Sequence, residues 1–246
     1  NNLDDNYELA GNIDCSDTIS WNGGAGFLPI GDPFNEIPFT GLLEGNNYSI
    51  SDLHINQSGG EYSLAAPFAY ANNAAFQDIR IVRPVISGSA SVVTYAAGLV
   101  VINTSNDNMG AITNVHITDA QLGAELDGSV ISAETGVAIG GIAASANMGQ
   151  HTDSRNEFRG TMDVGGPVGQ VFVGGLYGYV PSTMSVDNSF ARTNVTINNT
   201  LTGEDKYYML GGLIGNGSVS VNQSYAAGSI TVNDTEPAAV SLIGGI

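Results

Sequence analysis

Carboxylates are the most abundant side chains in this chain of 246 residues that could do chemistry. Asp and Glu number 24 against six Lys and Arg, for a formal charge of −18. Glycoside hydrolysis requires two carboxylates placed across a scissile bond. Pairs such as Asp4 with Asp5, or Asp14 with Asp17, arise readily in so acidic a chain and single out no site. The Gly-His-Gly and Arg-x-Lys segments of pectin hydrolases do not occur, so we predict no catalytic residue and no enzyme.

Two possibilities stay open, namely a lyase and a calcium site. A lyase needs a positioned base and a cation-binding pocket, and the only lysine, Lys206, lies in the turn-like segment GEDKYY. Calcium prefers oxygen ligands, and Asp14, Asp17 and Asp32 surround a glycine-rich loop, but there is no D-x-D-x-D-G loop. His54, His116 and His151 lack zinc-ligand spacing. We predict no cofactor, with calcium possible.

The remaining chemistry-bearing residues exclude several partners. Cys15 is the only cysteine, so the chain cannot form an internal disulfide, and we expect a small buried apolar residue there. Phosphate contacts require clustered Lys and Arg, which argues against nucleic acid and against anionic lipid. No apolar run reaches the roughly 18 residues of a membrane helix. We therefore predict neither a nucleic-acid partner nor membrane insertion.

The sequence contains a repeat, and the structural units that it encodes must position any functional site. Its clearest element is a glycine doublet in an apolar run, which reads AGLV from Ala97, GGIA from Gly140, GGLY from Gly174, GGLI from Gly211 and GGI from Gly244, with a weaker copy, APFAY, from Ala66. Successive second glycines are 43, 34, 37 and 33 residues apart. Periods of this length indicate stacked structural units. The glycines either bend the backbone with φ > 0 or let neighbouring units approach closely.

A second motif with strand-like alternation follows each doublet. It reads DLHI from Asp52, DIRI from Asp78, NVHI from Asn114, EFRG from Glu157, SFAR from Ser189 and SYAA from Ser224. Alternating β-branched and aromatic residues predict half-buried strands, and helical patterning is almost absent. We therefore predict an all-β parallel β-solenoid. Its inner columns would hold Leu53, Ile79, Val115, Phe158, Phe190 and Tyr225, and beside them Ile55, Ile81 and Ile117.

The third residue of each strand motif should point outward. This column contains His54, Arg80, His116, Arg159, Ala191 and Ala226, and so includes four of the nine Lys, Arg and His residues. Such a stripe could bind an anionic glycan. The first residues of the motifs, Asp52, Asp78, Asn114 and Glu157, would share the same face and pair with the cations. A salt-bridged, solvated face is the interpretation that we favour.

GGLYGY and GGLIGN, followed by NSFARTNVTI and QSYAAGSITV, resemble the GLUG repeat of large bacterial surface and secreted proteins. The head, NYELAGNIDCSDTISWNGGAGFLPIG, and the segment PFTGLLEGNNYSISDLHIN resemble the opening coils of the same proteins, so the resemblance covers nearly the whole chain. Glu44 and Asn47 replace the usual Asp and Gly, Ala66-Pro67-Phe68 replaces Gly-Leu-Phe, and one coil between Ala97 and Gly140 carries an insertion. The resemblance implies a right-handed parallel β-helix and an adhesin, often filamentous-haemagglutinin-like, with no catalytic residues to carry over.

We therefore expect one β-helix domain over residues 1–246, with head coils at 1–50 and repeat coils at 51–246. It would have seven or eight coils and be excised from a longer chain. The expected role is structural and adhesive, at a bacterial surface or outside the cell, with glycans or a host or biofilm surface as partners. A polysaccharide-active lyase or hydrolase is one alternative. A self-assembling fibre subunit is another, because the ends of a solenoid expose unpaired strand edges.

Two further features stay without a functional assignment. The polar segment from Met148 to Pro167 is either a protruding binding loop or an elongated turn. Eight Asn-x-Ser/Thr sequons occur, such as those at Asn194 and Asn216, and alternating polar strands explain them without glycosylation.

Overall fold

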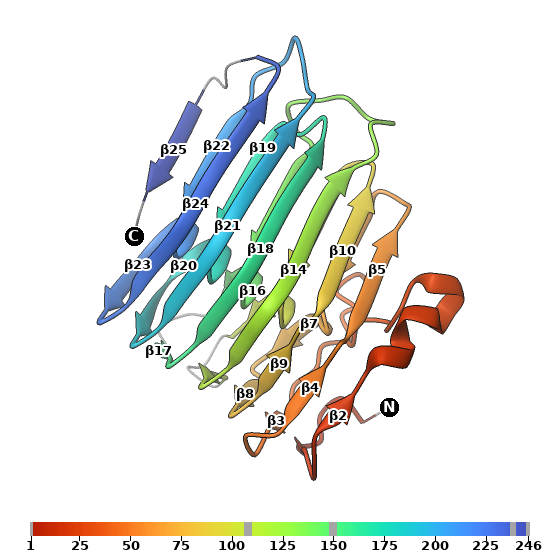
Figure 1. Cartoon of the computed structure of the whole chain (residues 1–246), viewed down its shortest axis with the longest axis vertical. Helices are drawn as coiled ribbons and strands as arrows, with labels where there is room; N and C mark the ends of the chain where they lie inside the picture. The colour runs from red at the N-terminus through yellow and green to blue at the C-terminus, as the bar shows by residue number, and fades with distance from the viewer. Residues whose placement is uncertain (1, 106–109, 148–151, 237–239, 245–246) are drawn as a thin grey trace.

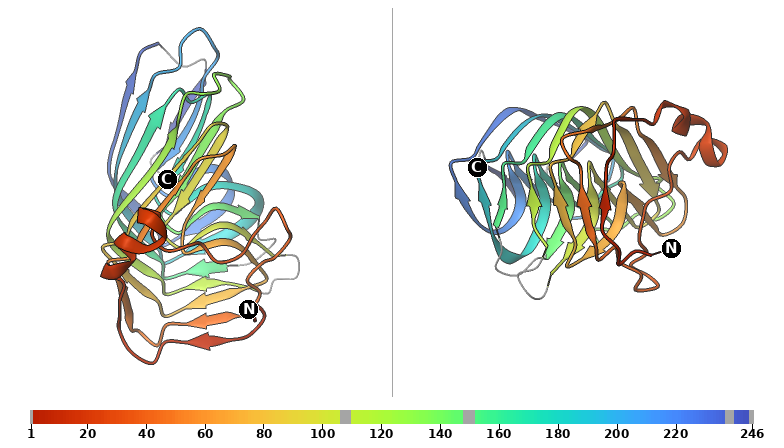
Figure 2. Two further views of the ribbon diagram at one scale, coloured as in Figure 1. Left: turned by 90° about the vertical axis from the view of Figure 1, so that its right-hand side faces the viewer. Right: turned by 90° about the horizontal axis from the view of Figure 1, so that it is seen from below.

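The chain winds into a solenoid of three parallel β-sheets, A, B and C (Figures 1 and 2). The computed structural model describes residues 2–105, 110–147, 152–236 and 240–244. Every pairing between the named strands is parallel, and the turns are stacked in sequence order in Figure 2, from red at the N-terminus to blue. The prediction of an all-β parallel β-solenoid is thereby confirmed.

Within the described residues, sheet A has ten strands and sheet B has nine. Sheet A consists of β1 (Tyr7–Glu8), β3 (Leu42–Glu44), β7 (Phe68–Asn72), β8 (Ala75–Gln77), β12 (Val100–Thr104), β13 (Ile112–Thr113), β16 (Ala143–Asn147), β17 (Thr152–Ser154), β20 (Tyr177–Asp187) and β23 (Ile214–Asn222). Sheet B consists of β2 (Ile13–Asp14), β4 (Ser49–Ser51), β5 (His54–Ser58), β9 (Arg80–Val82), β10 (Val85–Ala90), β14 (His116–Leu126), β18 (Glu157–Gly166), β21 (Phe190–Asn199) and β24 (Tyr225–Asp234).

Sheet C has six strands, which are β6 (Tyr62–Ala65), β11 (Val93–Ala97), β15 (Gly136–Gly140), β19 (Gln170–Gly174), β22 (Tyr207–Gly211) and β25 (Val240–Gly244). The solenoid therefore has about six turns, fewer than the seven or eight predicted. The predicted number of turns was too high because it included the head as complete coils. In the head, a kinked 3₁₀ segment, η1 (Ser16–Gly24), and a loop take the place of a strand of sheet C. None of the described helical residues form a segment of the length and apolarity needed to cross a bilayer.

Coil lengths vary because the turns between sheets vary. Paired residues in sheet A are offset by 33 positions between Leu43 and Phe76, and by 41 between Thr113 and Ser154. Part of the predicted insertion lies in the turn from Leu126 to Gly136, which separates β14 from β15. The segment from Met148 to Pro167 is mostly strand, since β17 and β18 occupy it, and residues 148–151 lie outside the described part of the chain.

The core between the sheets confirms that the inner residues predicted for the first coils are buried, but not that they form the predicted columns, because Ile55 pairs with Ile86 and Phe158 pairs with Ile117. Leu53, Ile79, Val115 and Phe158 are buried, as are Ile55, Ile81 and Ile117. The prediction was wrong for Phe190, which is half-buried, and for Tyr225, which is 57% exposed. Both lie on the outer face, in register with Glu157, while Ala191 and Ala226 face inward.

The reason for this shift is a change of chemistry inside the core. The positions that follow Val115 along its column are the buried polar residues Asn156 and Ser189. Asn156 accepts a hydrogen bond from the Val115 amide at 3.0 Å and donates to the Ile112 carbonyl at 2.7 Å. The Ser189 hydroxyl accepts from the Asn156 amide at 3.0 Å. A hydrogen-bonded polar ladder thus continues an apolar column, and apolar alternation alone cannot reveal its register.

The glycine doublets form the corner between sheets C and A. Gly140 and Gly141, for example, join β15 to β16, and Gly140 pairs with Gly174 in the next coil. None of the described doublet glycines has a positive φ, so that explanation is wrong. A Cβ atom on Gly141 would lie 2.2 Å from the Gly175 carbonyl oxygen and 2.3 Å from Cγ of Phe158. Close approach between coils is therefore the reason for the second glycine of the doublet. The first is required by the tight turn itself, since a Cβ atom on Gly140 would lie 1.8 Å from the carbonyl oxygen of Ala143 in the same coil.

Positive φ angles occur instead at the corner between sheets A and B. The stacked residues Asp78, Asn114, Arg155, Asn188 and Gln223 have φ between 46° and 56°. Asn and Asp tolerate this conformation better than other residues with a Cβ atom.

We predict that Gly141→Ala lowers the free energy of unfolding by about 3 kcal/mol, because neither a carbonyl nor a buried ring can move aside. Gly123→Ala is the matched control. Its Cβ would meet only the Ser87 Cβ, at 3.7 Å, and the change should stay within about 1 kcal/mol. Urea denaturation followed by circular dichroism measures both. Equal losses in the two variants would contradict the close-approach explanation.

Candidate functional site

The four residues of the predicted cationic stripe all lie in sheet B, but not in one column. Arg80 and His116 are direct neighbours in β9 and β14. His54 begins β5 and lies opposite Val85, which itself pairs with Gln121 further along β14. Arg159 pairs with Arg192, and the position next to His116 belongs to Glu157. The predicted column was wrong for two reasons. DLHI was aligned five residues out of register with DIRI, and the motif that begins at Glu157 was aligned two residues out of register with NVHI.

Glu157 binds two of these side chains, His116 and Arg159. His116 Nδ1 lies 2.9 Å from Oε2 of Glu157, and His116 Nε2 lies 2.9 Å from Oδ1 of Asn114. Arg159 forms an ion pair with Oε1 of Glu157, and its guanidinium carbon lies 5.0 Å from the centre of the Phe190 ring. These contacts match the salt-bridged interpretation of the face for His116 and Arg159. A ligand-binding role for the four stripe residues stays a prediction.

The other two stripe residues have different surroundings. Arg80 donates to Oδ1 of Asn47 at 3.4 Å. The His54 amide donates to the Thr18 hydroxyl at 2.9 Å, which ties η1 to β5. Asp52, expected to pair with the stripe, binds Arg83 instead, with 2.6 Å between Oδ2 and Nη2. The cations of sheet B are therefore dispersed along the coils and do not converge on one point.

Two of the three candidate calcium residues, Asp14 and Asp32, act as local turn caps. Asp14 accepts a hydrogen bond from the Ser16 amide at 2.9 Å, which lowers the pKa of its carboxyl. Asp32 accepts from the Asn35 side chain at 2.7 Å and from two backbone amides, and these bonds likewise lower its pKa. Within the described ranges no three His, Cys, Asp or Glu side chains are grouped for a metal ion. His151 lies outside those ranges, and calcium binding stays untested.

Cys15 and Lys206 are structural. Cys15 is half-buried against the core, and burial, followed by Asp14 and Asp52, raises the pKa of its thiol. Lys206, in the turn-like segment GEDKYY, is only 1% exposed. Its ammonium donates to the Leu201 carbonyl at 3.0 Å, to Asp234 at 2.5 Å and to the Glu236 carbonyl at 2.7 Å. The ammonium thus joins the last two coils.

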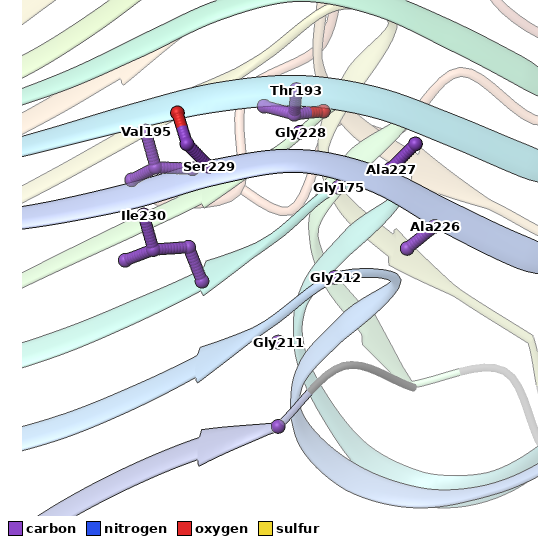
Figure 3. A pocket seen from close by; sticks show the side chains of 11 residues that line it. Gly175, Thr193, Val195, Gly211, Gly212, Ala226, Ala227, Gly228, Ser229 and Ile230 are labelled. Carbon is purple, nitrogen blue, oxygen red and sulfur yellow. The ribbon is translucent and has the colours of Figure 1, made fainter.

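A small cavity opens among the last coils, as Figure 3 shows. Its volume is about 150 Å³, and its polar side chains are the hydroxyls of Thr193 and Ser229. Val195, Ala226 and Ile230 make up most of the remaining side-chain wall. None of the lining residues is a carboxylate, a histidine or a cation. We therefore interpret the cavity as the open end of the apolar core and not as a catalytic site.

Charge is segregated between the faces of the solenoid. Charged side chains on the strands of sheet B include Arg80, Glu125, Glu157, Arg159, Asp163 and Arg192. Asp, Glu, Lys and Arg are absent from ten of the eleven described strands on either side of the doublet corner, which are β6, β7, β11, β12, β15, β16, β19, β22, β23 and β25. The eleventh, β20, carries Asp187 at the end of the strand away from this corner, beside Ser154 of β17. A chain of charge −18 thus keeps one long surface uncharged.

Aromatic side chains gather on this uncharged surface, which we call the outer corner. It comprises the outward residues of sheets C and A beside the doublets, which are Tyr62, Leu64, Tyr70, Tyr95, Ile102, Ser145, Gln170, Phe172, Tyr179, Met209 and Asn216. The rings of Phe172 and Tyr179 are 5.3 Å apart, and Tyr179 and Tyr62 are 36% and 48% exposed. Burial raises the pKa of Tyr95, and Tyr179 and Tyr62 add smaller contributions.

The surface of the outer corner turns inward between sheets C and A, so that some of its outward-pointing residues are buried. Val101 and Ala144 point away from the main core, yet neither is exposed. With Ala66 and Ala97 they form a second buried cluster, which contacts Leu64, Tyr95 and Ile102. Sequence reasoning missed this surface because apolar alternation was assigned only to the interior. The lack of charged residues around every doublet was the available signal.

Comparisons with known proteins give a limited result. No family model matches the chain, so the GLUG resemblance stays a prediction. A stretch of 87 residues, 35% of the chain, is 44% identical to Halomucin of Haloquadratum walsbyi, and the match spans 1% of that protein's length. A crystal structure of a "putative immunoglobulin A1 protease" from Bacteroides ovatus aligns with 97% of this chain and 77% of its own, at 14% identity and a TM-score of 0.45. The fold and the Halomucin match are compatible with an extracellular structural role.

Two substitutions test the orientation of β14. Val115→Asp places an unpaired charge in the core and should lower the free energy of unfolding by about 3 kcal/mol or more. His116→Ala removes a half-exposed ring bound to Glu157 and should cost about 1 kcal/mol. Urea denaturation of both proteins distinguishes them, and equal midpoint shifts would show that the register is wrong.

Proposed function

We propose that this chain is a structural and adhesive segment of a surface or secreted protein. The observation that carries the proposal is the segregation of the solenoid into a charged, solvated sheet B and an uncharged, aromatic outer corner. The charged face keeps a rigid rod soluble, and the outer corner provides a contact surface that extends over successive coils. The likeness to Halomucin, a protein named as a mucin, supports a place outside the cell.

The proposal includes the absence of enzymatic activity. Incubation with pectin, alginate and chitin-type polysaccharides, with and without calcium, should leave the polymers at full length in size-exclusion chromatography. Shortened products that disappear when a single carboxylate is replaced would instead establish the polysaccharide-active enzyme. A fibre subunit is the remaining alternative, and end-to-end filaments in electron microscopy would favour it.

Adhesion is tested with the intact chain coupled to beads. The beads should adhere to an unfractionated extracellular polymer matrix, and beads carrying urea-unfolded chain should not. A variant with Arg80, Arg159 and Arg192 replaced by Ser serves as a control. It measures how much the cationic residues of sheet B contribute to adhesion. Adhesion that is absent for the folded chain under all salt conditions would contradict the proposed function.

The proposal also predicts stabilisation by salt. At a charge of −18, repulsion among the carboxylates destabilises the folded chain, and salt screens this repulsion. Raising NaCl from about 0.1 M to about 1 M shortens the screening length from about 10 Å to about 3 Å, so the melting temperature should rise. Tetramethylammonium chloride should act similarly, since screening does not depend on a bound cation. A melting temperature that falls with either salt would contradict this account.

A further inference from the structure

We propose that the outer corner binds an uncharged polysaccharide that lies along the stacked coils. The inference rests on the proposed function, because it names the ligand class and the surface of that adhesive segment.

Charge selects the class of ligand. Apart from Asp187 at the far end of β20, the surface has no Asp, Glu, Lys or Arg on its described strands, while the chain as a whole carries −18. An anionic polymer would meet the repulsion of the whole body and no compensating cation. A second copy of the chain would bring another −18 against the first. An uncharged polymer meets neither obstacle, so charge complementarity favours it over both.

The spacing of the rings suits a long, repeating ligand. Tyr95, Ala138 and Phe172 occupy successive positions of one ladder, so the two rings are separated by two coil spacings, about 10 Å. Tyr179 adds a ring from the adjacent sheet, beside Phe172. Aromatic side chains offer broad apolar faces, and a tyrosine also offers a hydroxyl. Pyranose rings have matching apolar faces of C–H groups and polar edges.

Uncharged hydrogen-bonding groups lie between the rings. Gln170 belongs to the same strand as Phe172, and Ser145 and Asn216 flank Tyr179 in the ladder of sheet A. All three side chains are partly exposed. Amides and hydroxyls of this kind can donate to and accept from sugar hydroxyls. Apolar faces that alternate with such groups are the usual composition of a small-molecule or sugar site.

A pocket at the N-terminal end continues the outer corner. It has a volume of about 340 Å³ and lies between the head loop and the first strand of sheet C. The rings of Phe34 and Tyr62 are 5.5 Å apart at its wall. Nε2 of Gln57, another lining residue, has no hydrogen-bond partner within the described part of the chain. An additional sugar unit seated here would find an aromatic face, with Asp32 also lining the pocket, whereas the Gln57 amide nitrogen is itself buried.

The test measures binding of the folded chain to dextran, mannan and hydroxyethyl cellulose, with alginate as the anionic comparison, by affinity electrophoresis and calorimetry. We expect at least one of the three uncharged polymers to bind, with affinity nearly unchanged between about 0.1 M and about 1 M NaCl, because no ion pair is formed. A double variant that carries both Tyr62→Ala and Tyr179→Ala should weaken that binding about tenfold.

Two further variants separate binding from folding. Ser145→Glu adds a charge beside Tyr179 without removing a core contact, and it should weaken binding as well. Thr196→Ala on the outer face of sheet B is the matched control and should bind like the unchanged chain, with all melting temperatures recorded. Unchanged binding in Ser145→Glu, or no binding to any of the three uncharged polymers, would overturn the proposal. If adhesion to the polymer matrix persisted in that case, the proposed function would stand without this ligand.

Discussion

Close contact between successive coils at the doublet corner is the constraint on which the rest of the structure depends. A Cβ atom on Gly175 would lie 2.1 Å from the Gly212 carbonyl oxygen of the next coil, and one on Gly141 would lie 2.2 Å from that of Gly175. At the same corner, a single backbone carbonyl accepts hydrogen bonds from two backbone amides of the preceding coil. The Leu176 carbonyl accepts from Ile142 and Ala143, and the Leu213 carbonyl accepts from Leu176 and Tyr177. Glycine is required because the backbone itself fills the space of a side chain.

This constraint shapes the outside as well as the inside. Because the corner turns inward, small residues such as Ala97 and Ala144 are buried on its outer side, and larger outward residues converge above them. The convergence places Tyr95, Phe172 and Tyr179 close together on one surface. A charge there would lose hydration without gaining a partner, which is consistent with its absence from these strands. The described carboxylates lie instead on sheet B, in the turns and on strands of sheet A such as β3 and β17, where Glu44 is partly exposed and Asp153 is buried.

Much of the fold could be predicted from the sequence. The period of the doublets established stacked coils, and strict alternation fixed Val115 and Ile117 as buried. Alternation failed where Asn156 and Ser189 replaced apolar residues in the core, so Phe190 and Tyr225 were placed on the wrong face. The cationic stripe inherited the same error at Arg159. The outer corner could not be predicted from alternation, because whether an outward residue meets water depends on the angle between two sheets.

Native-state hydrogen exchange at the doublet corner tests the central claim most directly. If coil contact at this corner holds the solenoid together, the amides of Ile142 and Leu176 should exchange only by global unfolding. They should then be as slow as the amides of β14 and far slower than those of the turn from Leu126 to Gly136. Exchange of the corner amides at the rate of that turn would show that the corner opens independently, and would contradict the account.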